Sequence, residues 1–182
     1  MSGYQSLVGR IREDTKRKVM AAWRMYGTGQ VTRAQFQQLA AAILGQAGAK
    51  AAAAADLSVS LELSALNRRL EATSGVLPKR RTYMDAIVTI LDDTDHDTVM
   101  QLERLALNAP LEAAQTAAST AIGQSGASGW VRQMDPDPCQ LCRWWWREGR
   151  VWPLDHAMPT HPGCECVARP VNVDYKVREV TY

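Results

Sequence analysis

The stretch CQLCRWWWREGRVWPLDHAMPTHPGCEC, residues 139–166, contains all four cysteines of this 182-residue chain. Cys139 and Cys142 are separated by two residues, and His161, Cys164 and Cys166 follow after an intervening segment of 18 residues. Two cysteines at the first spacing can turn both sulfurs toward one ion, and a second group of ligands further along the chain completes a tetrahedron. The pattern therefore predicts a zinc site.

The candidate ligands outnumber the four positions of a tetrahedral site, because five are well spaced and His156 is a spare. We favour Cys139 and Cys142 with His161 and one of Cys164 or Cys166, and the spacing does not choose between the last two. The alternative is that these residues are buried small side chains or disulfide partners. A filled tetrahedron leaves no position for a reactive water, so we expect a structural zinc that holds together a segment too small to bury a core.

Three consecutive tryptophans, Trp144, Trp145 and Trp146, follow this cysteine pair. Consecutive residues cannot all point the same way, so we expect most of them to pack the small segment with Trp130 and Trp152. At least one is expected to face a partner, since tryptophan is enriched at interface hot spots. Stacking on nucleic-acid bases needs a basic groove, of which Arg143, Arg147 and Arg150 supply only a part.

Upstream of this segment the sequence predicts helices. Apolar residues recur at steps of three and four from Tyr4 to Tyr26, and Gly27-Thr28-Gly29 ends that pattern. Thr32 and Gln35 have the spacing of a capping box that opens a second helix. We expect a long arm or a thin packing surface from Gln46 to Ala55. A third helical unit is expected from the apolar pattern between Leu57 and Leu70, ending at Ser74-Gly75.

Two more helices are expected before the cysteines. Pro78 suits a first helical position, and Asp95 or Asp97 can cap the following helix. Pro110 should break or kink that helix. The tract 123–129 is predicted to be a flexible linker between a helical region, 1–122, and a small α+β knuckle, 130–182, with strands at 150–152 and 166–173. The predicted fold class is mainly α.

The charges suggest where partners bind. The chain has 21 basic and 19 acidic residues, so its net charge of +2 does not indicate a dedicated nucleic-acid binder. The first helix is nevertheless basic, and Arg10, Arg17 and Lys18 could meet DNA phosphates or an acidic protein. We find neither a secretory signal nor an apolar run of the length that a membrane span needs, and we expect no membrane contact.

Other motifs point away from catalysis. There is no phosphate-binding loop, nucleophile elbow or His-Glu-x-x-His motif. The cluster 92–97 lacks the spacing of a calcium loop and is expected to be an exposed acidic turn, with His96 solvated or capping. Residues 79–81 are expected to begin a helix. We therefore predict that the chain is not an enzyme and has no small-molecule substrate.

The C-terminal pattern resembles the C-terminal domain of phage Mu F-like minor head proteins. The resemblance covers about the last third of the chain. Glu165 stands where the family usually has a basic residue. The residues that carry the resemblance are Trp130, Asp135, Asp137, Cys139, Cys142, Gly149, His161, Pro162, Cys164, Cys166 and Pro170.

This resemblance implies a structural component of a tailed-phage virion, made in the host cytoplasm and placed inside the capsid or at the portal vertex. It implies a role in head assembly, with the portal protein or the major capsid protein as partner, and a contact with packaged double-stranded DNA. Two alternatives come from other classes. One is a zinc-ribbon protein that binds nucleic acid, and the other is a capsid maturation protease with Ser119 or a cysteine as nucleophile.

Overall fold

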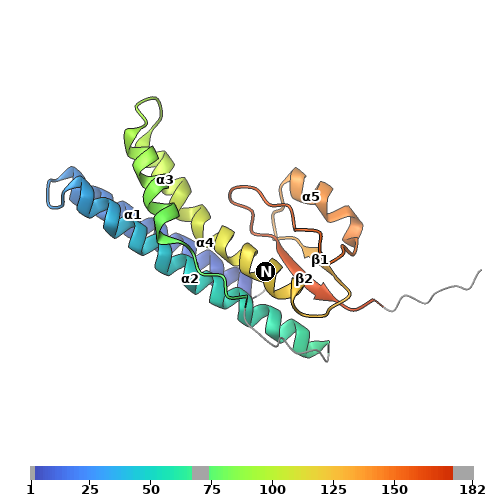
Figure 1. Cartoon of the computed structure of the whole chain (residues 1–182). Coiled ribbons are helices and arrows are strands. Elements are labelled where there is room, and N and C mark those ends of the chain that lie inside the picture. Colours follow the sequence, from blue (N-terminus) through green and yellow to red (C-terminus); the bar gives the residue numbers. More distant parts are fainter. Residues whose placement is uncertain (1–2, 67–73, 174–182) are drawn as a thin grey trace, which may run out of the picture.

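The computed structural model describes residues 3–66 and 74–173 and is mainly helical, with a small two-stranded sheet near the C-terminus (Figure 1). The predicted fold class is confirmed. The elements are α1 (Gly3–Gly27), α2 (Arg33–Ala65), α3 (Arg80–Asp92), α4 (Thr98–Gly123), β1 (Gly129–Gln133), α5 (Gln140–Trp146), a 3-10 turn η1 (Arg147–Gly149) and β2 (Val167–Val171).

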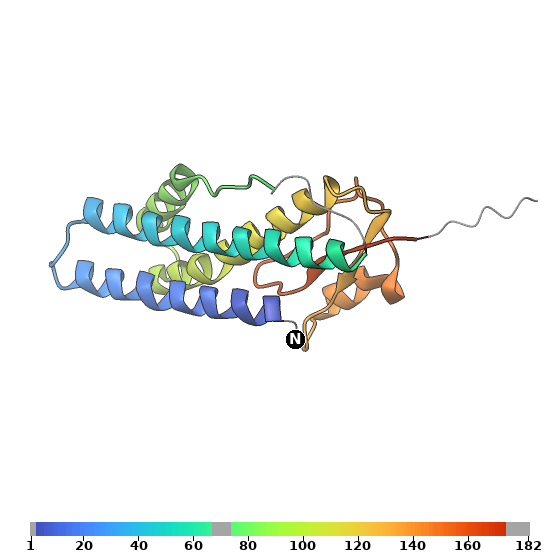
Figure 2. The same cartoon turned by 90° about the horizontal axis from the view of Figure 1, so that it is seen from below.

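The first two helices form a long hairpin, and Figure 2 shows them side by side along most of their length. Gly29 turns the chain with a φ of 72°, a conformation that glycine adopts without strain. The predicted capping box is present. The Gln35 backbone N–H donates to Thr32 Oγ1 at 3.3 Å, and the Thr32 N–H donates to Gln35 Oε1 at 2.8 Å.

The prediction of separate units within 33–70 is wrong, because α2 is one helix through Ala65. Its small residues are a packing surface, with Gly48, Ala51, Ala52 and Ala55 all buried. Ala51, Ala52 and Ala55 share a core cluster with alanines of α4, so the two backbones can approach closely, whereas Gly48 lies against Pro78. The end predicted at Ser74-Gly75 is later than the end of α2 at Ala65, and Leu70 lies outside the described residues.

Prolines and caps place the next helices. Pro78 precedes α3, whose N-cap is Lys79, so the predicted start at Pro78 is shifted by two residues. Asp97 caps α4 by accepting the N–H groups of Val99 and Met100. Of the two outcomes expected at Pro110, a break is excluded, because α4 is continuous and Pro110 is buried inside it.

The helices carry two apolar clusters. The distal cluster, centred on Phe36, Leu44 and Leu102, joins α1 to α4 away from the sheet. The proximal cluster contains residues of α1, α2 and α4 together with Trp130, Met158 and Ala168. Residues 129–173, called the C-terminal lobe from here on, therefore share a core with the helical bundle.

The tract predicted as a linker is a short ordered turn. Gly123 is the last residue of α4, Gly129 is the first of β1, and Ser125 between them is buried and donates to the Ile122 carbonyl at 2.7 Å. A Cβ on Gly129 would lie 2.4 Å from the Trp152 carbonyl oxygen. A flexible linker is therefore the wrong description of this segment, because Ser125, Ala127 and Gly129 are buried.

The sheet differs in part from the prediction. β2 lies within the predicted strand 166–173, and it pairs antiparallel with β1, a strand the sequence reasoning missed. Trp130 lies opposite Pro170, and Arg132 lies opposite Ala168. The predicted strand 150–152 is only a single bridge between Trp152 and Trp130. Among the described helices, none is long and apolar enough to cross a membrane.

Two glycines of α2 provide a test of the close packing. Gly45 has no atom within 4 Å of an added Cβ, whereas a Cβ on Gly48 would lie 2.6 Å from Pro78 Cγ. We expect Gly45→Ala to raise the free energy of unfolding by about 0.5–1 kcal/mol, because alanine lowers the entropy of the unfolded chain. Gly48→Ala should lower it, as measured by urea denaturation. Equal stabilisation by both substitutions would contradict the packing.

Candidate metal centre

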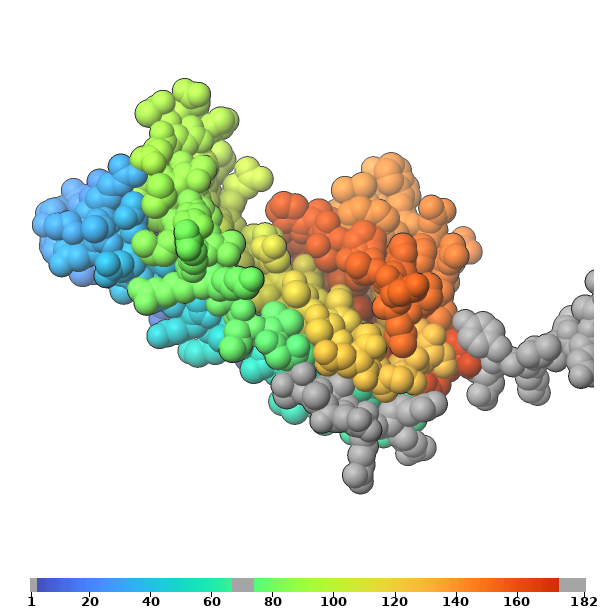
Figure 3. All heavy atoms as spheres, in the orientation of Figure 1, coloured from blue at the N-terminus to red at the C-terminus, as the bar shows by residue number. Residues whose placement is uncertain are grey.

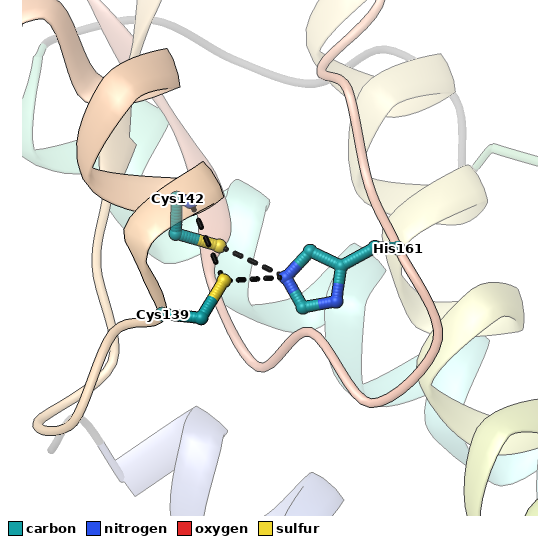
Figure 4. Close-up of side chains that lie close together, drawn as sticks. All are labelled: Cys139, Cys142 and His161. Carbon is teal, nitrogen blue, oxygen red and sulfur yellow. Dashed lines mark hydrogen bonds between the residues drawn. The ribbon is translucent and has the colours of Figure 1, made fainter.

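The start of α5 positions the first pair of ligands. Cys139 is the N-cap residue, and its sulfur accepts the backbone N–H of Cys142 at 3.5 Å. Because Cys142 is in the first turn of the helix, both sulfurs point to the same side, toward the ring of His161 (Figure 4). The geometry of the first helical turn thus brings the two sulfurs together, as the two-residue spacing predicts.

The second group of ligands lies on the segment 153–166, called the metal loop here, which runs from the Trp152 bridge into β2. His161 Nε2 lies 3.1 Å from Cys139 Sγ and 3.3 Å from Cys142 Sγ. Cys164 Sγ lies 3.6 Å from Cys142 Sγ. The residues form two groups that share Cys142, one with Cys139 and His161 and one with Cys164 and Cys166, each with its ligand atoms within 4.8 Å.

These five residues could hold a metal ion, as predicted. All four cysteines are free thiols, and Cys142, Cys164 and Cys166 are buried, so the disulfide alternative does not describe the structure. The spare candidate, His156, belongs to neither group and stacks on Trp152 with ring centroids 4.4 Å apart.

The ring of His161 is oriented by its own segment. Nδ1 lies 3.0 Å from the carbonyl oxygen of Pro162, which favours a proton on that nitrogen and leaves the Nε2 lone pair facing the sulfurs. Burial lowers the pKa of His161, but the Pro162 carbonyl and the negative charge of Cys164 and Cys139 outweigh it and raise the pKa overall. This tautomer is the one that coordinates a metal through Nε2.

The thiols differ in acidity. Burial raises the pKa of Cys142 to about 12, whereas the neighbouring Cys166 thiol, by hydrogen bonding, lowers the pKa of Cys164 to about 5. The same contact raises the pKa of Cys166. The backbone N–H of Cys142 lowers the pKa of Cys139. The four thiols therefore differ in acidity, and a cation that binds them must displace protons, above all from Cys142.

Arg132, on β1, is a member of the site that sequence reasoning missed. It is 2% exposed, and its Nη1 lies 3.9 Å from both Cys142 Sγ and Cys164 Sγ. Its Nη2 donates to the Pro159 carbonyl, and its guanidinium lies 5.4 Å from the Trp145 ring centroid. The available signal was strand alternation, because Trp130 and Arg132 occupy the same face of β1.

Side chains of the bundle bind the backbone of the metal loop. Gln115 on α4 donates to the carbonyls of Cys164, at 2.6 Å, and Cys166, at 3.4 Å. Gln5 on α1 donates to the Glu165 carbonyl at 3.2 Å, and Arg12 forms an ion pair with the Glu165 side chain. Glu165 thus has a defined partner in α1.

The three consecutive tryptophans have different environments. Trp144 is 61% exposed, while Trp145 and Trp146 are half-buried. The ring of Trp145 lies 6.0 Å from that of His161 and also contacts Arg132. Trp130 is buried, and its Nε1 donates to the His156 carbonyl at 2.8 Å. Trp144 is therefore the one tryptophan of 144–146 that projects mainly into solvent.

The predicted basic residues of α1 lie apart from the cysteines. Arg17 and Lys18 both pair with Asp14, at 3.1 and 2.7 Å. Arg10 and Lys18 line a groove of about 210 Å³ between α1 and α2, and Lys50 of α2 also lines it. His96, as predicted, is exposed, and it lies 3.0 Å from Asp93 in the acidic turn.

No protein-family model, curated protein or solved structure matches this chain.

The different environments of two adjacent tryptophans lead to a prediction. Trp145→Ala should lower the free energy of unfolding by about 1–3 kcal/mol, because its ring covers His161 and Arg132 and its loss leaves a cavity beside the site. Trp144→Ala should change it by less than about 0.5 kcal/mol, because the side chain is mainly solvated. Chemical denaturation of both variants measures the difference, and a larger loss for Trp144→Ala would contradict the assignment.

Proposed function

We propose that the bound metal is zinc and that its role is structural. The observation that carries this is the convergence of Cys139, Cys142 and His161 from two segments on one point, with Cys164 in contact. Sulfur and imidazole ligands in this combination suit zinc. When bound, the ion would supply crosslinking between α5 and the metal loop, which have no other extensive apolar core of their own.

The role of the lobe follows from its attachments. Gln115, Gln5 and Arg12 bind the metal loop, and Asn108 Oδ1 accepts the Gly163 N–H at 3.1 Å. Because these side chains come from α1 and α4, fixing the loop also fixes how the lobe sits on the bundle. We infer that zinc sets the position of the whole lobe.

Metal analysis tests this proposal. The purified chain should contain about one zinc per molecule, and His161→Ala should lose it while His96→Ala, an exposed histidine outside the cluster, should retain it. Chelation or Cys139→Ser should disorder the lobe and spare most far-ultraviolet helix signal.

Zinc affinity should fall as the pH falls, because protons compete for the sulfurs, most of all at Cys142. A purified chain that contains no zinc, and whose lobe remains ordered in the presence of a chelator, would contradict the proposal.

We propose further that the chain is a minor head protein of a tailed bacteriophage, acting in assembly near the portal or the inner capsid surface. The residues that carry the family resemblance have structural roles in the lobe, which supports this. Trp130 pairs with Pro170 across the sheet, and the Cys166 thiol donates to Asp135 at 3.4 Å. The residues of the resemblance thus include parts of the sheet and of the cysteine cluster of this lobe, which supports the proposal.

Two surfaces are the best candidates for partner contacts. The first is the outer face of α5, where Leu141 and Trp144 are exposed beside Arg143 and Arg147. Arg147 and Glu148 just after it have positive φ angles of 49° and 56°, a strain that is common at binding sites. The second is the groove between α1 and α2, where Arg10 and Lys50 lie near the Lys18–Asp14 ion pair and could meet the phosphates of packaged DNA.

Copurification tests the assembly role. The chain, co-expressed with the portal and major capsid proteins of its phage, should copurify with one of them, and Trp144→Ala should weaken that association at least about fivefold without loss of zinc. Arg104→Ala, an exposed charge on α4, serves as the control. Failure to associate with either protein would count against the assembly role and leave the zinc proposal unaffected.

A second candidate function, nucleic-acid binding by the lobe, is favoured by the arginines that flank exposed Trp144. Titration with single-stranded DNA at two salt concentrations separates the two roles. A steep loss of affinity with salt, reduced by Arg143→Ala and Trp144→Ala together, would favour nucleic acid over a protein partner.

A further inference from the structure

The buried guanidinium of Arg132 lacks an acidic partner. Within 3–66 and 74–173, no ion pair with a carboxylate involves this side chain, although it is 2% exposed. Its contacts are the Pro159 carbonyl, the face of Trp145 and the sulfurs of Cys142 and Cys164. A buried cation without a counter-charge is strongly destabilising, so the sulfurs must supply the negative charge.

The charge of a filled site fits this requirement. Three thiolates, a neutral imidazole and one divalent cation carry a net charge of −1, which the guanidinium neutralises. Four thiolates and a divalent cation would carry −2 and leave one charge uncompensated inside the lobe. A set of three cysteines and one histidine therefore matches a single buried arginine.

The surroundings of Cys164 and Cys166 differ in a way that selects between them. Cys164 Sγ faces Arg132 Nη1 and Cys142 Sγ, whereas Cys166 Sγ donates to the carboxylate of Asp135. A cation that binds Cys142 beside Arg132 would thus take Cys164 as its next ligand, because Cys164 Sγ lies next to both.

We infer that the metal ligands are Cys139, Cys142, His161 and Cys164, that Cys166 lies outside the set as a hydrogen-bond donor, and that Arg132 is a positioning residue that balances the charge of the metal–thiolate centre. This inference rests on the proposed metal site and names its ligands. It gives Asp135 a role as well, because its carboxylate is the contact of the Cys166 side chain outside the ligand set.

Cobalt(II), titrated into the full chain after removal of any bound metal, is the probe, because the strength of its sulfur-to-metal absorption band follows the number of bound thiolates. Cys166→Ala should keep the band and the cobalt affinity of the unsubstituted chain. Cys164→Ala should lose about a third of the band, one thiolate of three. Arg132→Met should weaken cobalt binding about 10–100-fold, as expected for loss of an outer partner, and Arg132→Lys should restore most of it because it keeps the charge.

Helix content from circular dichroism is recorded for every variant. If Arg132→Met does not fold, Arg132→Lys and the two cysteine variants still decide the question. A smaller band for Cys166→Ala than for Cys164→Ala, or unchanged affinity in a folded Arg132→Met chain, would overturn the inference while leaving metal binding in place. Absence of any cobalt band in the unsubstituted chain would overturn both the inference and the proposed zinc site.

Discussion

The contact of sulfurs and an imidazole between α5 and the metal loop is the interaction on which the C-terminal lobe depends. The lobe has one short helix, one two-stranded sheet and long connecting segments. Apart from the proximal cluster that it shares with the bundle, its apolar contacts are those of Cys142, Cys164 and Cys166 with Met134 packed against them. Such a segment buries too little apolar surface to order itself. A cation shared by the two segments would replace the missing core with a few strong bonds.

The bundle prepares the place where this lobe sits. Alanines of α2 and α4 bring the two helices close together, and the same surface receives Trp130 and Ala168 from the sheet. Polar side chains at the edge of this contact, above all Gln115, bind carbonyl groups of the metal loop that would otherwise be buried without partners. The space-filling view in Figure 3 shows the lobe lying against α4 along one end of the molecule. Packing and ligand geometry are therefore coupled, since the residues between Gly163 and Cys166 take part in both.

The proposed assembly role follows from rigidity more than from chemistry. A filled tetrahedral centre offers no open coordination position, and within the described residues Ser119 has no hydrogen bond to a histidine or an acid that would activate it. What the lobe does offer is an exposed tryptophan on a helix anchored at its first residues by two sulfurs. A side chain presented in this way loses little freedom when a partner binds, which favours association.

The sequence by itself determined most of the bundle helices, two of their caps and the residues of the metal cluster. Thr32 and Asp97 cap helices through short-range hydrogen bonds, and the spacing of Cys139 and Cys142 places two sulfurs on one side of a helix start, so both are local properties that a linear pattern carries. Only the tertiary structure decided that α2 is continuous, that residues 129–133 form a strand, and that Arg132 lies against the sulfurs. Those features depend on contacts between segments far apart in the chain, where burial against α4 compensates for weak local preference and where the charge of a distant cluster makes a buried arginine tolerable.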